Sequence, residues 1–165
     1  MEHAPLLETK KLKKFFATSR GTLHAVDDVD LVIQPSQTLG VVGESGCGKS
    51  TLGKTILQLT NPTSGEILFH GRNIVGLSKR EIKNLRRNMQ MVFQDPYSSL
   101  DPRMSVSQLI EDPMIVYGVP KSERLRKVRE LMDIVGLAQR FATAYPHELD
   151  GGRRQRIGIA RALSL

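Results

Sequence analysis

The sequence predicts an α/β fold that passes into a helical second part. A short apolar run, residues 38–42, leads into a glycine-rich loop and then into apolar residues at helical spacing. Strand-like and helix-like segments alternate up to Pro96, and beyond that residue the spacing is helical only. The 165 residues fit one domain, and 39% hydrophobic with 25% charged residues excludes collagen-like, mucin-like and disordered classes.

Several other classes of protein are excluded by simple counts. No apolar run approaches the ~18 residues that a membrane span needs. The first fourteen residues carry charges where a signal peptide has its apolar core. The single cysteine, Cys47, excludes an internal disulfide and any site with several cysteines. We therefore expect a cytosolic chain.

The net charge of +7 is unevenly spread along the chain. Residues 1–82 hold 10 basic and 8 acidic residues, whereas residues 83–165 hold 14 basic and 9 acidic residues. Solvated helix faces explain most of this excess, although a basic face could also meet nucleotide, lipid headgroups or nucleic acid. Aromatic residues make up only 5% and tryptophan is absent, which disfavours single-strand or RNA binding. We expect no nucleic-acid partner.

The elements before the helical part can be assigned in order. Residues 25–32 alternate as a half-buried strand does, and residues 34–36 form a turn. The apolar run 38–42 predicts a strand buried on both faces. A helix begins near Gly48 and is broken by residues 61–65.

Further segments follow the same alternation. Residues 66–70 predict a strand, and residues 78–88 predict a helix that Ser78 and Glu81 cap reciprocally. Residues 90–93 are again strand-like.

Two helices dominate the second part of the chain. They are expected at residues 105–117, where Pro113 interrupts the pattern, and at residues 121–135. A helical lobe therefore begins near residue 100.

The glycine-rich loop carries the most specific motif. Residues 43–50, GESGCGKS, match G-x-x-x-x-G-K-[ST] in full between a predicted strand and a helix. Glycines let backbone amides wrap a phosphate, and the start of the helix adds its positive dipole. Lys49 is expected on the β- and γ-phosphates, and Ser50 on Mg²⁺. A simple glycine-rich turn would explain the glycines but not Lys49 and Ser50.

We expect ATP and Mg²⁺ as ligands. The expected nucleotide-binding residues of the loop are Gly43, Glu44, Ser45, Gly46, Cys47, Gly48, Lys49, Ser50 and Thr51. For Cys47 a metal or redox role is an alternative to that of a small residue whose amide binds.

Two later motifs connect the chain to a known family. Gln94 lies in MVFQDPYSSLDPRMSV, 45 residues after Lys49, and residues 149–153, LDGGR, run into RQRIGIARAL. With the phosphate loop, these three ordered motifs resemble the ATP-binding subunits of ABC transporters, of the oligopeptide/dipeptide importer type. The resemblance extends from residue 7 to residue 165.

The resemblance implies a fold and a division of the chain. It implies a P-loop NTPase (RecA-like) core with a small N-terminal antiparallel β-lobe and an inserted helical lobe. Residues 1–99 would form the β-lobe and phosphate-loop core, residues 100–148 the helical lobe, and residues 149–165 the signature motif and its helix.

The resemblance also implies roles for single residues. Gln94 would position Mg²⁺ or the attacking water, so that Ser50 and Gln94 are the expected metal-binding residues. Phe16, with Phe15 as the alternative, would stack on adenine, and ordinary core packing would account for either ring equally well.

The signature would act on a neighbouring subunit. Asp150, Gly151 and Gly152 would bind in trans the ATP that a second subunit holds. The signature departs from the family's LSGGQ pattern, since Asp150 replaces Ser and Arg153 replaces Gln. Asp keeps the capping function but brings a carboxylate towards an anion, which Arg153 could offset. We hypothesise a functional but altered site, with a degenerate site as the alternative.

The catalytic carboxylates of the family have no counterpart after the signature. No four apolar residues followed by Asp-Glu occur there, and residues 108–112 imitate the pattern too early. We expect the C-terminal part of the core to be missing, and no catalytic residue on this chain besides the candidate Gln94. Alone, the chain is expected to fold poorly, or to need a complementing fragment, and to hydrolyse ATP negligibly.

The predicted function is that of an ATP-binding subunit that energises import of peptides or similar small solutes. The implied partners are membrane permease subunits, a second ATP-binding subunit and, indirectly, a substrate-binding protein. The implied location is cytoplasmic, peripheral on the inner face of the cell membrane. The alternatives are a soluble ABC-type ATPase not coupled to transport and a nucleotide-binding fragment that does not hydrolyse ATP.

Overall fold

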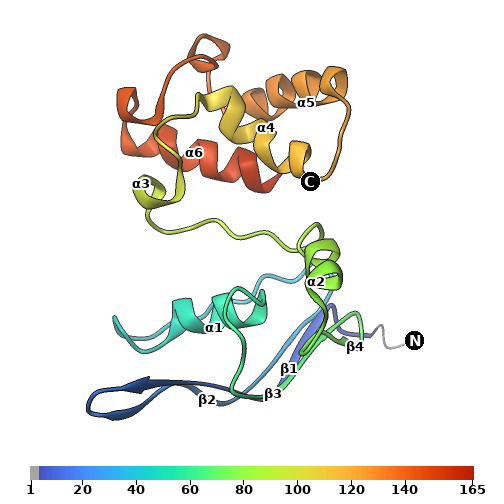
Figure 1. The fold of residues 1–165 in the computed structure, drawn as a ribbon, viewed down its shortest axis with the longest axis vertical. Coiled ribbons are helices and arrows are strands. Elements are labelled where there is room, and N and C mark those ends of the chain that lie inside the picture. The colour runs from blue at the N-terminus through green and yellow to red at the C-terminus, as the bar shows by residue number, and fades with distance from the viewer. Residues whose placement is uncertain (1–3) are drawn as a thin grey trace. The chain divides into compact units, whose positions relative to one another are not determined.

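The computed structural model describes residues 4–165, except the side chains of Pro96 and Ser98, and it falls into two compact units. The first unit ends at Arg86 and the second begins at Arg87 (Figure 1). The units thus divide ahead of residue 100, and the three-part division expected from the resemblance stays a prediction.

The first unit is built on a four-stranded antiparallel sheet. Its strand order is β2-β1-β3-β4 (Figure 1). The strands are β1 (Leu7–Thr18), β2 (Gly21–Ile33), β3 (Ser64–Phe69) and β4 (Arg72–Asn73). The predicted strands at 25–32 and 66–70 are confirmed within β2 and β3, and the antiparallel β-lobe is confirmed.

The pairing of β1 with its neighbours is irregular. Its register with β2 shifts three times between Thr9 and Phe15, and Lys11 has φ 47°. Against β3, the shift lies next to Gly65, whose φ is +91°. A Cβ at Gly65 would lie 2.4 Å from the carbonyl oxygen of Lys11, so the close approach of β3 to β1 at this register shift requires glycine.

Helix α1 (Lys49–Ile56) packs against β1 and β2. The loop that leads into α1 passes very close to β2, since a Cβ at Gly48 would lie 2.0 Å from the carbonyl oxygen of Ala25. Gly48 has φ 97°, which favours glycine for a second reason. The packing of α1 on the sheet thus fixes where the phosphate loop ends.

Helix α2 (Lys79–Leu85) has the predicted cap. The Ser78 side chain accepts the amide of Glu81, and the Glu81 carboxylate accepts the amide of Ser78. This reciprocal pattern is the capping box expected from the two residue types at this spacing.

The two predicted strands of the parallel core, residues 38–42 and 90–93, are not formed. Val42 is 94% exposed, which contradicts the prediction of a strand buried on both faces. A β-strand exists through its hydrogen bonds to neighbours. Among residues 4–165, no strand pairs with either segment, so their apolar composition alone does not make them strands.

The second unit is helical. Its elements are α3 (Pro96–Ser99), α4 (Val106–Val116), α5 (Lys121–Ile134), the 3₁₀ turns Gln139–Phe141 and Pro146–Glu148, and α6 (Gly151–Ala162). The predicted helices at 105–117 and 121–135 are confirmed as α4 and α5, and α4 continues through Pro113.

One apolar cluster joins the helices of the second unit. Val106, Ile110 and Met114 of α4 are fully buried with Met132 of α5 and Ile157 of α6. The α4 positions recur every four residues, so one face of this helix meets the others. Through Ile157 and Ala160, the cluster packs α6, which begins at the signature, against α4 and α5.

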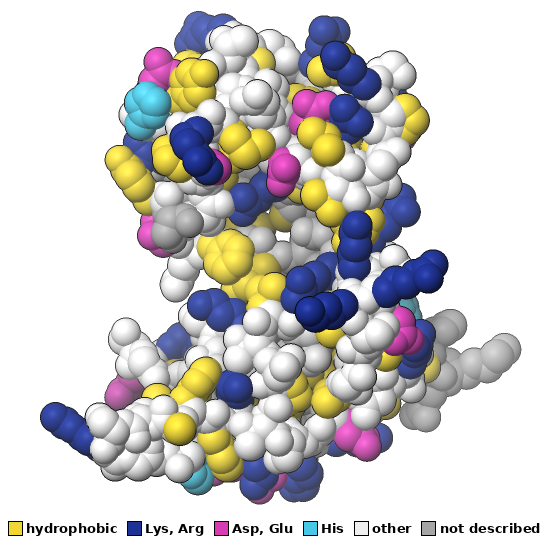
Figure 2. All heavy atoms as spheres, viewed as in Figure 1, with side chains coloured by type: hydrophobic (Ala, Val, Ile, Leu, Met, Phe, Trp, Pro, Cys, Tyr) yellow, Lys and Arg dark blue, Asp and Glu magenta, His cyan; other side chains and the backbone are white. Residues whose placement is uncertain are grey.

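Charged side chains cover the surfaces of both units. Figure 2 shows Lys and Arg scattered over the viewed face with acidic side chains among them. That mixture is what solvated surfaces show, in line with the expectation for most of the +7 charge. Within residues 4–165, every helix is too short or too polar to traverse a lipid bilayer.

Candidate nucleotide-binding loop and signature segment

Lys49 closes the glycine-rich loop of the first unit. Its ammonium nitrogen donates to the carbonyl oxygens of Gly43 at 2.7 Å and Glu44 at 2.6 Å. The amide of Cys47 donates to the Glu44 carbonyl oxygen at 3.3 Å, which adds a turn inside the loop. The loop is therefore folded around the Lys49 ammonium.

The amides at the start of α1 have no side-chain cap. Its cap residue is Gly48, which has no side chain that could accept their hydrogen bonds. By contrast, Ser78, Ser105 and Asp150 cap α2, α4 and α6 with side-chain oxygens. An uncapped first turn leaves backbone N–H groups for an external anion, and the helix dipole favours negative charge there.

Ser50 and Cys47 are both exposed in the loop. The Ser50 hydroxyl, in the first turn of α1, has the oxygen chemistry that Mg²⁺ prefers, so this residue fits the expected metal. Cys47 Sγ lies 3.5 Å from the Lys49 ammonium. Among residues 4–165, no group of three His, Cys, Asp or Glu side chains could hold a metal, so a metal cluster on Cys47 finds no support.

The two aromatic candidates for adenine stacking differ in what they touch. The Phe15 ring stacks on His24, with centroids 3.8 Å apart and planes 15° from parallel. The Phe16 ring is 37% exposed, and the Lys14 ammonium lies 4.8 Å from its centroid. Because a protein ring already covers one face of Phe15, Phe16 is the better candidate, and its role stays a prediction.

Gln94 lies in the second unit, and its side chain is exposed. It directly precedes Asp95, whose carboxylate accepts the Tyr97 amide at 2.9 Å and caps α3. The structure thus places Gln94 just outside a capped helical turn. Its expected role towards Mg²⁺ or water stays a prediction.

Two arginines of α6 anchor the segment that follows Gln94. The Arg154 guanidinium lies 4.1 Å from the centroid of the Tyr97 ring. Arg161 Nη1 donates to the Ser99 carbonyl oxygen at 2.7 Å, and burial lowers the pKa of Arg161. Neither arginine was predicted from the sequence, although a separation of seven residues places them on one face of α6.

The signature segment starts α6 with a charged cap. Asp150 Oδ1 accepts the Arg153 amide at 2.8 Å, and Asp150 Oδ2 lies 2.8 Å from Arg153 Nη1. The amide of Arg153 is the main cause that lowers the pKa of Asp150. The predicted capping function of Asp150 is confirmed.

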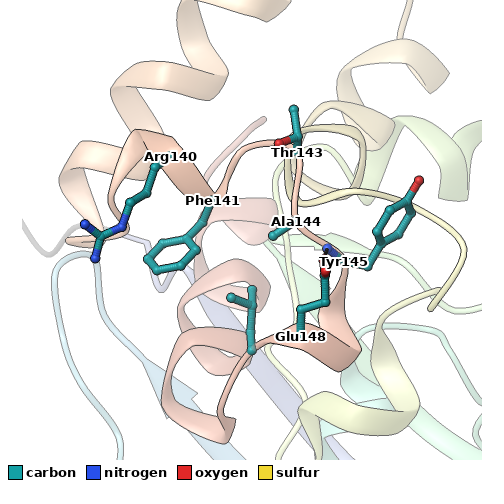
Figure 3. A pocket seen from close by; sticks show the side chains of 7 residues that line it. Arg140, Phe141, Thr143, Ala144, Tyr145 and Glu148 are labelled. Carbon is teal, nitrogen blue, oxygen red and sulfur yellow. Dashed lines mark hydrogen bonds between the residues drawn. The ribbon is translucent and has the colours of Figure 1, made fainter.

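A cavity of about 390 Å³ lies beside the signature (Figure 3). Its lining residues are Arg140, Phe141, Thr143, Ala144, Tyr145, Glu148 and Leu149. The Arg153 guanidinium lies 4.7 Å from the centroid of the Phe141 ring, so this wall of the cavity also supports the signature. The cavity was not predicted from the sequence, because its residues come from a loop and two 3₁₀ turns.

A phosphate loop on a β-rich unit and a signature helix on a helical unit define an ATP-binding cassette protein. Residues 26–165 match the family model described as ABC transporter. The chain therefore belongs to the ABC transporter family, and the family predicted from the three motifs is confirmed.

Among known proteins, the chain is similar to peptide-transport ATPases. It is 51% identical over 163 residues to the oligopeptide transport ATP-binding protein OppF of Bacillus subtilis, covering 97% of this chain and 53% of that protein. It is 43% identical over 166 residues to a putative peptide import ATP-binding protein of Brucella ovis, covering 100% of this chain and 52% of that protein. The chain thus spans about half the length of these relatives.

Solved structures confirm the cassette fold. The ATP-binding cassette MJ0796, in a dimeric post-hydrolysis state bound to ADP and Pi, superposes with a TM-score of 0.88 at 30% identity. That match covers 96% of this chain and 69% of the other. The protein cbiO1 of Clostridium perfringens, part of the complex cbiONQ, superposes with a TM-score of 0.80 at 28% identity, over 98% and 62% of the two chains.

Proposed function

We propose that this chain is the nucleotide-binding part of an ATPase subunit that energises import of peptides or similar small solutes. The observation that carries the proposal is the phosphate loop folded around Lys49 at the uncapped start of α1. The similarity to OppF across nearly the whole chain supports peptides as the cargo class.

In this proposal the loop residues 43–51 hold the ATP phosphates. The amides of the first turn of α1 bind phosphate oxygens, and the Lys49 ammonium exchanges its carbonyl partners for the β- and γ-phosphates. Ser50 and Gln94 supply oxygen ligands for Mg²⁺, which when bound neutralises charge on the phosphate oxygens. Phe16 offers its exposed ring to the adenine.

The signature acts in trans on a second ATP-binding subunit. Asp150, Gly151 and Gly152 meet the nucleotide that the second subunit holds, so the site is complete only when two subunits close. The dimeric state of the similar cassette MJ0796 supports this arrangement. Closure then moves membrane permease subunits, and a substrate-binding protein takes part indirectly by delivering cargo.

Such a subunit works in the cytoplasm, peripherally on the inner face of the cell membrane. Nucleic acid is not among its partners in this proposal. ATP hydrolysis belongs to the full protein, because no Asp-Glu after an apolar strand occurs in residues 1–165.

Affinity purification of the full protein from its native membrane tests the transport assignment. Permease subunits are expected in the purified complex, and ATP is expected to drive peptide uptake when the complex is placed in vesicles. The Lys49→Ala variant should keep the permease contacts and lose uptake. Purification with ribosomes or nucleic acid in place of permeases would favour the alternative of an ATPase not coupled to transport.

A further inference from the structure

The two departures from the family's signature pattern contact each other. Asp150 and Arg153 are joined twice, by the amide of Arg153 at 2.8 Å and by the guanidinium at 2.8 Å. Their side chains are 58% and 44% exposed, so both charges lie at the surface where α6 begins. Two substitutions that form an ion pair with each other behave as one feature of the site.

The charge of Asp150 affects phosphate binding because this residue caps the start of α6. A serine cap would leave the start of α6 neutral, whereas the Asp150 carboxylate adds a negative charge beside the amides of Gly151 and Gly152. Negative charge there repels the phosphate that these amides would bind. The Arg153 guanidinium offsets that charge, because it lies within contact distance of the carboxylate.

A third residue keeps Arg153 in this position. The Arg153 guanidinium lies over the Phe141 ring, 4.7 Å from its centroid, and Figure 3 shows Phe141 at the edge of the neighbouring cavity. A cation over an aromatic face is attracted by the ring, which restricts the swing of a long side chain. Arg153 is thus held by the carboxylate and the ring together.

We propose that Asp150 and Arg153 are a coupled pair that sets the charge of the signature segment, so that this segment accepts the terminal phosphate of ATP held by a second subunit. The inference rests on the proposed function and deepens it. Arg153 is a positioning residue that acts through Asp150, and the pair tolerates loss of both charges better than loss of the positive charge alone.

The test uses the full protein with Mg²⁺ and an ATP analogue that resists hydrolysis. Nucleotide-dependent association of two subunits is measured by sedimentation velocity at about 0.1 M and about 0.5 M salt. Arg153→Gln leaves an uncompensated carboxylate and should weaken association about tenfold at low salt. The deficit should shrink at high salt, because screening reaches exposed charges.

Two further variants separate charge from helix capping. Asp150→Asn combined with Arg153→Gln keeps a capping side chain without charge and should associate within about twofold of wild type. Arg126→Gln breaks an exposed ion pair with Glu130 on α5 and should change nothing. Thermal unfolding of each variant reports the capping contribution separately.

The possible outcomes distinguish a failure of the coupled pair from a failure of the proposed function. Three results would overturn the coupled pair and leave the proposed function standing. They are wild-type association of Arg153→Gln, a double variant as weak as Arg153→Gln, and an association deficit that salt does not change. Wild-type protein that does not bind the analogue would overturn the proposed function, and the pair with it.

Discussion

Two glycines of the first unit lie so close to a neighbouring strand that no side chain fits there. Gly65 lies where β3 approaches β1 closely, and Gly48 lies where the phosphate loop passes β2. At both positions a side chain would collide with a carbonyl oxygen that belongs to a strand and cannot move aside. The sequence does not reveal these contacts, because glycine also occurs in strands and loops at bulges, bends and turns.

Replacing Gly65 by alanine tests this close approach. Gly65→Ala adds both the cost of φ +91° and a collision at 2.4 Å, and we expect it to destabilise the first unit by about 3 kcal/mol or more. Gly71→Ala is the matched control, since Gly71 has φ +74° with open space around it and should cost only about 1–2 kcal/mol. The free energies of unfolding of the two variants in urea, measured in the full protein, compare them, and equal losses would contradict the collision.

At the scale of elements, the longer helices were predictable, whereas α3, the two 3₁₀ turns and half of the strands were not. The helix caps Ser78, Ser105 and Asp150 act locally, so residue type and spacing are enough to predict them. Strand β1 was not predicted from periodicity, because its three register shifts against β2 break the alternation of buried and exposed residues.

The failed strand predictions have a different cause. Residues 38–42 and 90–93 have strand composition but no partner among residues 4–165. Leu39, Val41 and Val42 are exposed, since no strand among residues 4–165 pairs with their segment. A buried strand depends on its neighbours, so a local pattern predicts it only when those neighbours are present. Whether the isolated chain folds poorly stays a prediction.

The contact between α6 and α3 makes an element-scale prediction. Arg161→Ala removes the hydrogen bond that the partly buried guanidinium donates to the Ser99 carbonyl oxygen, so we expect the second unit to lose about 1–3 kcal/mol. Chemical denaturation of the full protein measures the loss. Arg126→Ala, which removes an exposed arginine of α5, should change stability by less than about 0.5 kcal/mol. A smaller loss for Arg161→Ala than for Arg126→Ala would refute the anchoring role.

The molecule as a whole carries a glycine-rich loop in its first unit and a signature segment in its second, which we propose to bind phosphate and a neighbouring subunit's phosphate. The loop motif was predictable, because its chemistry lies in eight consecutive residues, 43–50. The anchoring by Arg154 and Arg161 was not, because it joins residues far apart in the chain. The cavity at Phe141 was not either, because irregular backbone shapes it. The roles of Gln94 and Phe16 stay predictions.

The central claim is that the loop around Lys49 binds the phosphates of ATP. Equilibrium titration of the full protein with Mg·ATP should give saturable binding, and Lys49→Ala should weaken it at least about tenfold, because an ion pair with phosphate is lost. Lys54→Ala, on the same helix but outside the loop, is the matched control and should bind as wild type. Equal affinity of Lys49→Ala and wild type, or no binding by either, would contradict the account.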